Sequence, residues 1–139
     1  MNFLAEIQQT AARAAKIDGL GDLALSVEHA AGRLGELALH IGKTAMSPDF
    51  KVAFAHALPF LYAMGDTIMA WMLLWRAAVA SEKLAGKPKK KDIAFYEGQI
   101  KTAEFFINTE LPLTFGRMEA IKGGCDAAIE ISDEGFGGM

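Results

Sequence analysis

Cysteine is almost absent from this chain of 139 residues, which contains one thiol, that of Cys125. A single thiol cannot close a disulfide within the chain, so we expect a reducing, cytoplasmic location. Positive charge is also scarce: 14 lysines and arginines stand against 17 acidic residues, and the formal net charge is −3. Because no broad basic surface is available, we predict that nucleic acid is not a partner.

Catalytic and metal-binding motifs are sparse as well. The sequence has no glycine-rich phosphate-binding motif and no strand-like alternation of apolar and polar residues. Glu36 and His40 are the one close pair of possible metal ligands, and no matching pair lies on another predicted helix. The N-terminal residues are amphipathic, so we do not expect a signal peptide. We predict no catalytic residue, no metal site and no cofactor bound to this chain alone.

A long apolar run occupies residues 52–75, where Asp66 is the only formal charge. A run of this length can cross a bilayer. However, a carboxylate near its middle would cost roughly 2.5–3.5 kcal/mol in hydrocarbon, and the helical pattern continues through Arg76 and Lys83. We therefore predict a helix buried in protein and no membrane association.

Apolar residues recur every three or four positions in four segments, which predicts four helices. The third and fourth, over about 48–86 and 92–122, would each be on the order of 50 Å long at 1.5 Å per residue. We predict an all-α fold, an antiparallel four-helix up-down bundle with long third and fourth helices. Residues 1–122 would form this bundle domain, and 123–139 an extended C-terminal tail, ordered in part where its apolar residues, Phe136 among them, can dock.

Two helices carry clear apolar stripes. In the second helix, small residues beside the stripe, Gly35 among them, predict a groove for aromatic side chains of the third helix. Pro59 should bend the third helix, and Pro112 should bend or interrupt the fourth. Because the third helix is apolar on two sides, one bundle cannot cover it, and we predict an additional partner surface. The expected buried positions are Leu23, Val27, Ala30, Leu34, Leu37 and Ile41 in the second helix, then Phe54, Leu58, Leu61, Gly65, Ile68, Met72, Trp75 and Val79, with a further stripe of Phe60, Met64, Trp71 and Leu74, in the third.

Four residues of the third helix are candidates for buried polar contacts or partner binding: Asp66, His56, Trp71 and Trp75. Burying an unpaired carboxylate is costly, so we predict that Asp66 contacts a polar group on a helix across the bundle; a role in a pocket is the alternative. We interpret His56 as a hydrogen-bonded histidine of the bundle rather than a general base.

Several runs of the sequence resemble a known protein domain. The runs ALPFLYAMGD (57–66), WMLLWRAA (71–78) and FYEGQIKTAEFF (95–106), with the Glu110-Leu-Pro112 step, resemble the C-terminal helical domain of acyl-CoA dehydrogenases. The domain is similar to the one found in a subgroup that includes the enzymes described as 3-methylmercaptopropionyl-CoA dehydrogenase-like. The resemblance covers nearly the whole chain, including the Gly-Phe-Gly-Gly ending.

The resemblance implies a role within a larger enzyme. Members of the family are FAD-dependent flavoproteins that oxidise an acyl-CoA thioester: a glutamate base takes the α proton and flavin N5 takes the β hydride. The base and most flavin contacts belong to the preceding dehydrogenase core, and no residue here matches the base. The resemblance thus implies a structural and interaction domain that contacts the catalytic core, a second copy in a homo-oligomer, or both, with FAD in the parent enzyme only.

Two questions stay open at this stage. The chain is either a segment of a longer enzyme or a short gene product encoding the domain alone, and in isolation we expect it to be inactive. The alternative function is a free-standing helical-bundle binding protein, or a small cofactor-binding enzyme that uses Asp66, His56 and Glu104.

Overall fold

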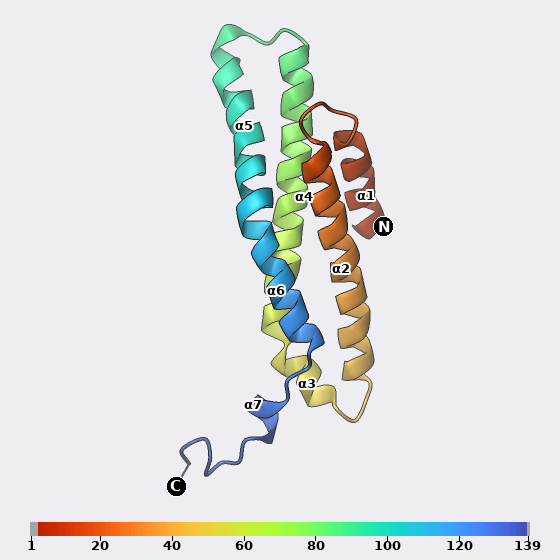
Figure 1. The fold of residues 1–139 in the computed structure, drawn as a ribbon, viewed down its shortest axis with the longest axis vertical. Coiled ribbons are helices and arrows are strands. Elements are labelled where there is room, and N and C mark those ends of the chain that lie inside the picture. Colours follow the sequence, from red (N-terminus) through yellow and green to blue (C-terminus); the bar gives the residue numbers. More distant parts are fainter. Residues whose placement is uncertain (1–2, 139) are drawn as a thin grey trace.

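The computed structural model describes residues 3–138, and within them the chain is helical with no strand, which confirms the predicted all-α class (Figure 1). The long elements are α1 (Phe3–Ala14), α2 (Gly21–Ala45), α4 (Ala57–Ala85), α5 (Ile93–Phe105) and α6 (Leu111–Lys122). The short ones are α3 (Phe50–Ala55), the 3-10 turn η1 (Lys90–Asp92), the π-helical turn η2 (Phe106–Glu110) and α7 (Ala127–Glu130).

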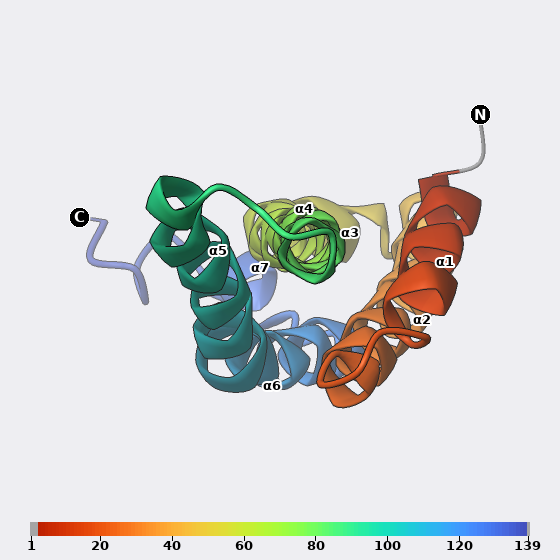
Figure 2. The ribbon, with the colours of Figure 1, turned by 90° about the horizontal axis from the view of Figure 1, so that it is seen from above.

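Helix α4 is the centre of the arrangement. It packs against α1, α2, α5 and α6, and Figure 2 shows α5 and α1 on opposite sides of it. In Figure 1, α2 runs down the view, α4 runs up, and α5, η2 and α6 descend along one line. Because α5 and α1 lie on opposite sides of α4, the described helices do not cover the outer side of α4 in the upper part of the fold.

Two prolines interrupt the long predicted helices. Pro59 has no N–H to donate to the carbonyl of Ala55, and the helix breaks at His56, between α3 and α4. Pro112 likewise has no N–H for the carbonyl of Asn108, and the turn that precedes it is π-helical. Both predicted interruptions are present, and each lies within the turn before its proline.

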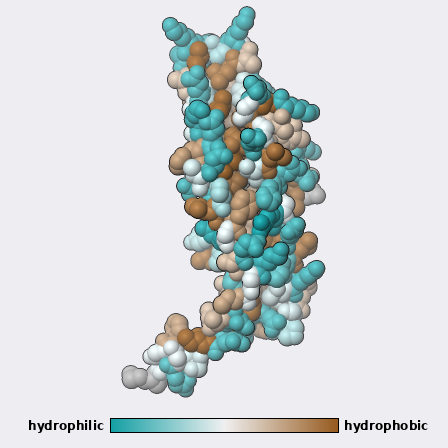
Figure 3. All heavy atoms as spheres, in the orientation of Figure 1, coloured by the Kyte–Doolittle hydropathy of each residue, from teal (hydrophilic) through white to brown (hydrophobic). Residues whose placement is uncertain are grey.

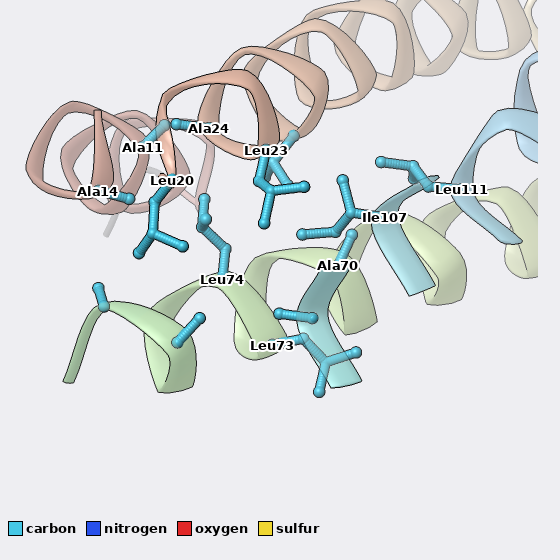
Figure 4. Packing of buried hydrophobic residues seen from close by; sticks show 14 of the residues in the cluster. Ala11, Ala14, Leu20, Leu23, Ala24, Ala70, Leu73, Leu74, Ile107 and Leu111 are labelled. Atoms are coloured by element: carbon cyan, nitrogen blue, oxygen red, sulfur yellow. The ribbon is translucent and has the colours of Figure 1, made fainter. Parts of the chain in front are cut away.

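The hydrophobic core is shared by α1, α2, α4, α5, η2 and the start of α6. Figure 4 shows Leu74 extending from α4 toward Leu20 and Leu23, with Ile107 and Leu111 beside them. The stripe predicted for the second helix is confirmed at five of its six positions, since Ile41 is half-buried and the others are buried in α2: Leu23, Val27, Ala30, Leu34 and Leu37.

The first buried stripe predicted for the third helix is wrong. Leu58 and Leu61 are each 55% exposed and Trp75 is 46% exposed, while Leu74, from the second stripe, is fully buried. Helix α4 faces the core mainly through small side chains, which allow α1, α2 and α6 to approach closely. The positions of the predicted stripe that lie in α4 are exposed or half-buried, and we call them the α4 outer stripe: Leu58, Leu61, Gly65, Ile68, Met72, Trp75 and Val79.

At Gly35, the small-residue groove on α2 is filled by α1 rather than by the predicted aromatic residues. The Cδ1 atom of Leu4 lies 3.0 Å from the position that a Cβ on Gly35 would take. The contact therefore comes from α1, not from the aromatic residues of α4. A Cβ at position 35 would require the side chain of Leu4 to shift by a few tenths of an ångström.

The C-terminal tail leaves the lower end of the helices (Figure 1). It begins with a contact between α7 and α3. Ile131 is 46% exposed and Phe136 is 82% exposed, so the predicted docking of Phe136 on the bundle is wrong. The glycine-rich segment carries Phe136 away from the other helices and leaves its ring in solvent.

An ion pair between Arg13 of α1 and Glu82 of α4 should be visible in the titration of Glu82. Arg13 donates from Nε at 2.9 Å and from Nη2 at 2.5 Å. These hydrogen bonds hold the pKa of Glu82 below its ordinary value, against the opposing effect of desolvation. A lowered pKa means that the pair stabilises the fold above the ordinary glutamate pKa, and that this contribution is lost as the pH falls through the lowered value.

The measurement is a carboxyl-carbon NMR titration. In Arg13→Gln the pKa of Glu82 should rise toward the ordinary glutamate value. The control is Arg33→Gln, because Arg33 pairs with Glu119 instead, and it should leave the titration of Glu82 unchanged. An unchanged Glu82 pKa in Arg13→Gln would contradict the assignment.

Candidate functional site

Asp66 is held by two side chains of α6. The hydroxyl of Thr114, which is fully buried, donates to Oδ2 of Asp66. Nη1 of Arg117 donates to the same oxygen at 2.6 Å, and the guanidinium lies 5.5 Å from the ring centre of Tyr62. The Asp66 and Arg117 side chains are each 36% exposed. The cluster therefore links α4 to α6 at the edge of the core.

The partners of Asp66 were not identified from the sequence. Thr114 and Arg117 are separated by three positions, which places them on one face of a helix. That spacing was the available signal, but it is common on helices and does not indicate which acid they would meet. Only the packing of α6 on α4 brings the three side chains together.

We expect Asp66 and Arg117 to couple by about 1 kcal/mol in a double-mutant cycle of Asp66→Ala and Arg117→Ala. This value exceeds that of a typical exposed pair because the carboxylate also binds a buried hydroxyl, and it stays modest because both side chains are partly solvated. Urea unfolding of the four proteins measures it. As a control, Lys101 and Glu104, a pair within α5 whose lysine is 76% exposed, should couple by no more than about 0.5 kcal/mol. Equal coupling for the two pairs would contradict the expectation.

His56 lies at the junction of α3 and α4 and is half-buried. Its Nε2 is 3.1 Å from the carbonyl oxygen of Cys125. A carbonyl can only accept, so Nε2 carries the proton and donates it. This bond joins the start of the tail to the α3–α4 junction.

The two tryptophans lie in different environments. Trp71 is partly buried, donates from Nε1 to the hydroxyl of Thr10 at 2.8 Å, and meets the ring of Phe3 edge-to-face at 5.7 Å. It therefore fixes α1 against α4. Trp75 lies one turn further along, on the outer stripe, and is 46% exposed. The structure thus separates a tryptophan that holds the fold together from one that is available for contact.

The α4 outer stripe is an apolar surface that the other described helices leave partly uncovered. Among the described helices, α4 alone is long and apolar enough to cross a membrane by length and composition, and 28% of its most apolar window is buried. Figure 3 shows the molecule from the side of α6, where hydrophilic residues cover much of α2 and α6. An apolar surface of this kind on a protein marks a contact site.

A polar hollow of about 310 Å³ lies at the lower end, between α2, α3 and the end of α6. Its charged or titratable lining residues are His40, Asp49, His56, Lys122 and Asp126. Within residues 3–138, no three histidine, cysteine, aspartate or glutamate side chains are grouped as metal ligands. Glu36 and His40 therefore have no third ligand among the described residues.

An apolar groove of about 220 Å³ lies at the other end, between α4 and α5. Sites for drug-sized ligands are usually about 300–1,000 Å³. FAD is larger than most such ligands, and the two glycines that line the polar hollow, Gly123 and Gly124, follow the C-terminal end of α6, where the helix dipole disfavours a pyrophosphate. The two hollows do not fit FAD, so no chemical step of a flavin is assigned to this chain.

Comparisons with known proteins identify the family of this helical chain. Residues 3–132 match the family described as "Acetyl-CoA dehydrogenase C-terminal like". The chain is 34% identical over 77 residues to the broad-specificity linear acyl-CoA dehydrogenase FadE5 of Mycobacterium tuberculosis, a match that covers 55% of this chain and 13% of the relative. It is 32% identical over 93 residues to the butyryl-CoA dehydrogenase of Syntrophomonas wolfei, covering 66% of this chain and 15% of the relative. Since the family match spans nearly all of the sequence, the chain belongs to the acetyl-CoA dehydrogenase C-terminal-like family.

Proposed function

We propose that this chain is the C-terminal structural and interaction domain of an FAD-dependent acyl-CoA dehydrogenase. The observation that carries the proposal is the family match over residues 3–132, together with two relatives that are both named as acyl-CoA dehydrogenases. The parent reaction would be α,β-dehydrogenation of an acyl-CoA thioester in the cytoplasm, in an enzyme of the 3-methylmercaptopropionyl-CoA dehydrogenase-like subgroup. The catalytic base and FAD would belong to the core.

The α4 outer stripe supports this role, because it supplies an apolar surface that the chain's own helices do not cover. In the proposal, the face from Pro59 to Trp75 packs against the dehydrogenase core. Leu61 is 55% exposed and Trp75 is 46% exposed in the chain alone, and both would be buried there. Residues 1–122 would act as one antiparallel up-down helical bundle, and residues 123–139 as a separate tail.

Association with a dehydrogenase core tests the proposal. A suitable partner is the Syntrophomonas wolfei butyryl-CoA dehydrogenase from which the segment similar to this chain has been removed. Added to that protein, the chain should co-elute with the flavin absorbance in size-exclusion chromatography. Failure to bind this core would count against the proposed docking face.

The purified chain alone gives a second readout. We expect a colourless protein that does not reduce a dye in the presence of an acyl-CoA, because the base and the flavin site belong to the core. A yellow preparation, or acyl-CoA-dependent dye reduction, would contradict the proposal and favour a small cofactor-binding enzyme.

A further inference from the structure

The groove between α4 and α5 is open to solvent and aromatic. Trp75 and Val79 line it from α4, and Phe95 and Tyr96 line it from α5. Trp75 is 46% exposed and Phe95 is 61% exposed. A cavity of about 150 Å³ can hold benzene, so a groove of about 220 Å³ has room for one phenyl ring.

Positive charge surrounds the upper end of this groove. Arg76 lines the groove itself. Beyond it, five of the chain's 14 lysines and arginines lie between Lys83 and Lys91, at the α4–α5 turn, and all five are exposed. This concentration is notable in a chain with a net charge of −3. The groove therefore favours an occupant that combines an apolar side chain with carboxylates.

The tail of the same chain has that combination. Residues 123–138 contain four carboxylates and neither lysine nor arginine. Phe136 is 82% exposed, and Asp133 and Glu134 come just before it in the sequence. Figure 1 shows the tail projecting from the end of the molecule opposite to the α4–α5 turn.

We propose that the tail of one copy binds the α4–α5 groove of a second copy, with Phe136 in the groove and Asp133 and Glu134 beside the lysines of the turn. The proposal goes beyond docking on a dehydrogenase core, since it uses the tail and the upper groove, which shares only Trp75 with the proposed docking face. The second copy is the occupant because the carboxylates of its tail match the lysines of the turn, and Phe136 matches the apolar groove.

The length of the tail argues against binding within one chain. The lower end of α4 is separated from Trp75 by 18 residues of helix, or roughly 27 Å at 1.5 Å per residue. The tail is attached below, where α7 contacts α3 and His56 binds the carbonyl of Cys125. The residues from Ile131 to Phe136 span at most about 22 Å when fully extended. They cannot reach their own groove while α7 stays in place.

Sedimentation equilibrium of the full chain at low ionic strength tests the proposal. We expect reversible self-association that weakens at least tenfold between 50 and 500 mM NaCl, since the contact includes several charges. Phe136→Ala should weaken it at least tenfold. The matched control is Phe105→Ala, which removes a ring of α5 that is 62% exposed and does not line the groove, and it should change the affinity less than twofold.

A charge exchange separates this contact from nonspecific association. One variant carries Lys89→Glu, Lys90→Glu and Lys91→Glu, and the other carries Asp133→Lys and Glu134→Lys. Neither should self-associate, whereas their mixture should form a mixed complex. Circular dichroism verifies that each variant is helical.

Three results would overturn the proposal: a monomer at all concentrations, self-association that survives Phe136→Ala, or variants that do not rescue each other. Binding to anionic lipid vesicles by a chain that stays monomeric would also overturn it, in favour of a membrane surface. Since these measurements involve no dehydrogenase core, their failure and the failure of core binding are distinguishable.

Discussion

Replacing Leu74 with alanine is expected to lower the free energy of unfolding by about 2–5 kcal/mol. Leu74 is fully buried and belongs to the main core cluster with residues of α1, α2 and η2. Truncation removes apolar surface from the core and leaves a cavity between helices that cannot fully close. A domain of this size is typically stable by only about 5–15 kcal/mol, so the loss would be a large fraction of the total.

Leu58→Ala is the matched control for this experiment. It makes the same change on the same helix, but Leu58 is 55% exposed, so we expect a loss below about 1 kcal/mol. Urea unfolding followed by circular dichroism measures both. Equal losses for the two variants would mean that the face of α4 described as buried is not the one that faces the core.

The second large effect is expected at the proposed docking face. Leu61→Glu should weaken binding to the dehydrogenase core by about 100-fold or more, because a carboxylate buried without a partner costs several kcal/mol. Leu61 is 55% exposed in the chain alone, so the substitution should leave its helicity and unfolding midpoint nearly unchanged. Isothermal titration calorimetry with the truncated Syntrophomonas wolfei enzyme provides the affinity.

Leu39→Glu provides the control for the docking experiment. Leu39 lies on α2 and is 68% exposed, outside the proposed face, so this variant should bind within twofold of the unchanged chain. If both substitutions weaken binding equally, the effect is one of added negative charge, and the α4 outer stripe is not the docking face.

The helices themselves follow from local sequence. Periodicity located the long helical segments, and Pro59 and Pro112 placed their interruptions, because a missing N–H acts within one turn of its own residue. The seam of α2 was also predictable, since Leu23, Val27 and Leu34 are large and lie on one side of an otherwise polar helix.

The face that α4 buries was not predictable in the same way. When a helix is apolar nearly all round, its periodicity does not distinguish the side facing the core from the side facing a partner. The large residues suggested one stripe as core, but close helix packing selected Ala63, Ala70 and Ala77 for it. The pairing of Asp66 with Arg117 was hidden for a related reason, since the partners are 51 positions apart in the chain.

The sequence by itself determined the all-helical class, the seam of α2, the two proline interruptions and the excess of apolar residues on the third predicted helix. These properties depend on neighbours within one or two helical turns. Only the tertiary structure decided which side of α4 is buried, what holds Asp66, which tryptophan is free for contact and where Phe136 lies. Those outcomes depend on which helices approach one another, and this is set by the shapes of side chains that are distant in the sequence.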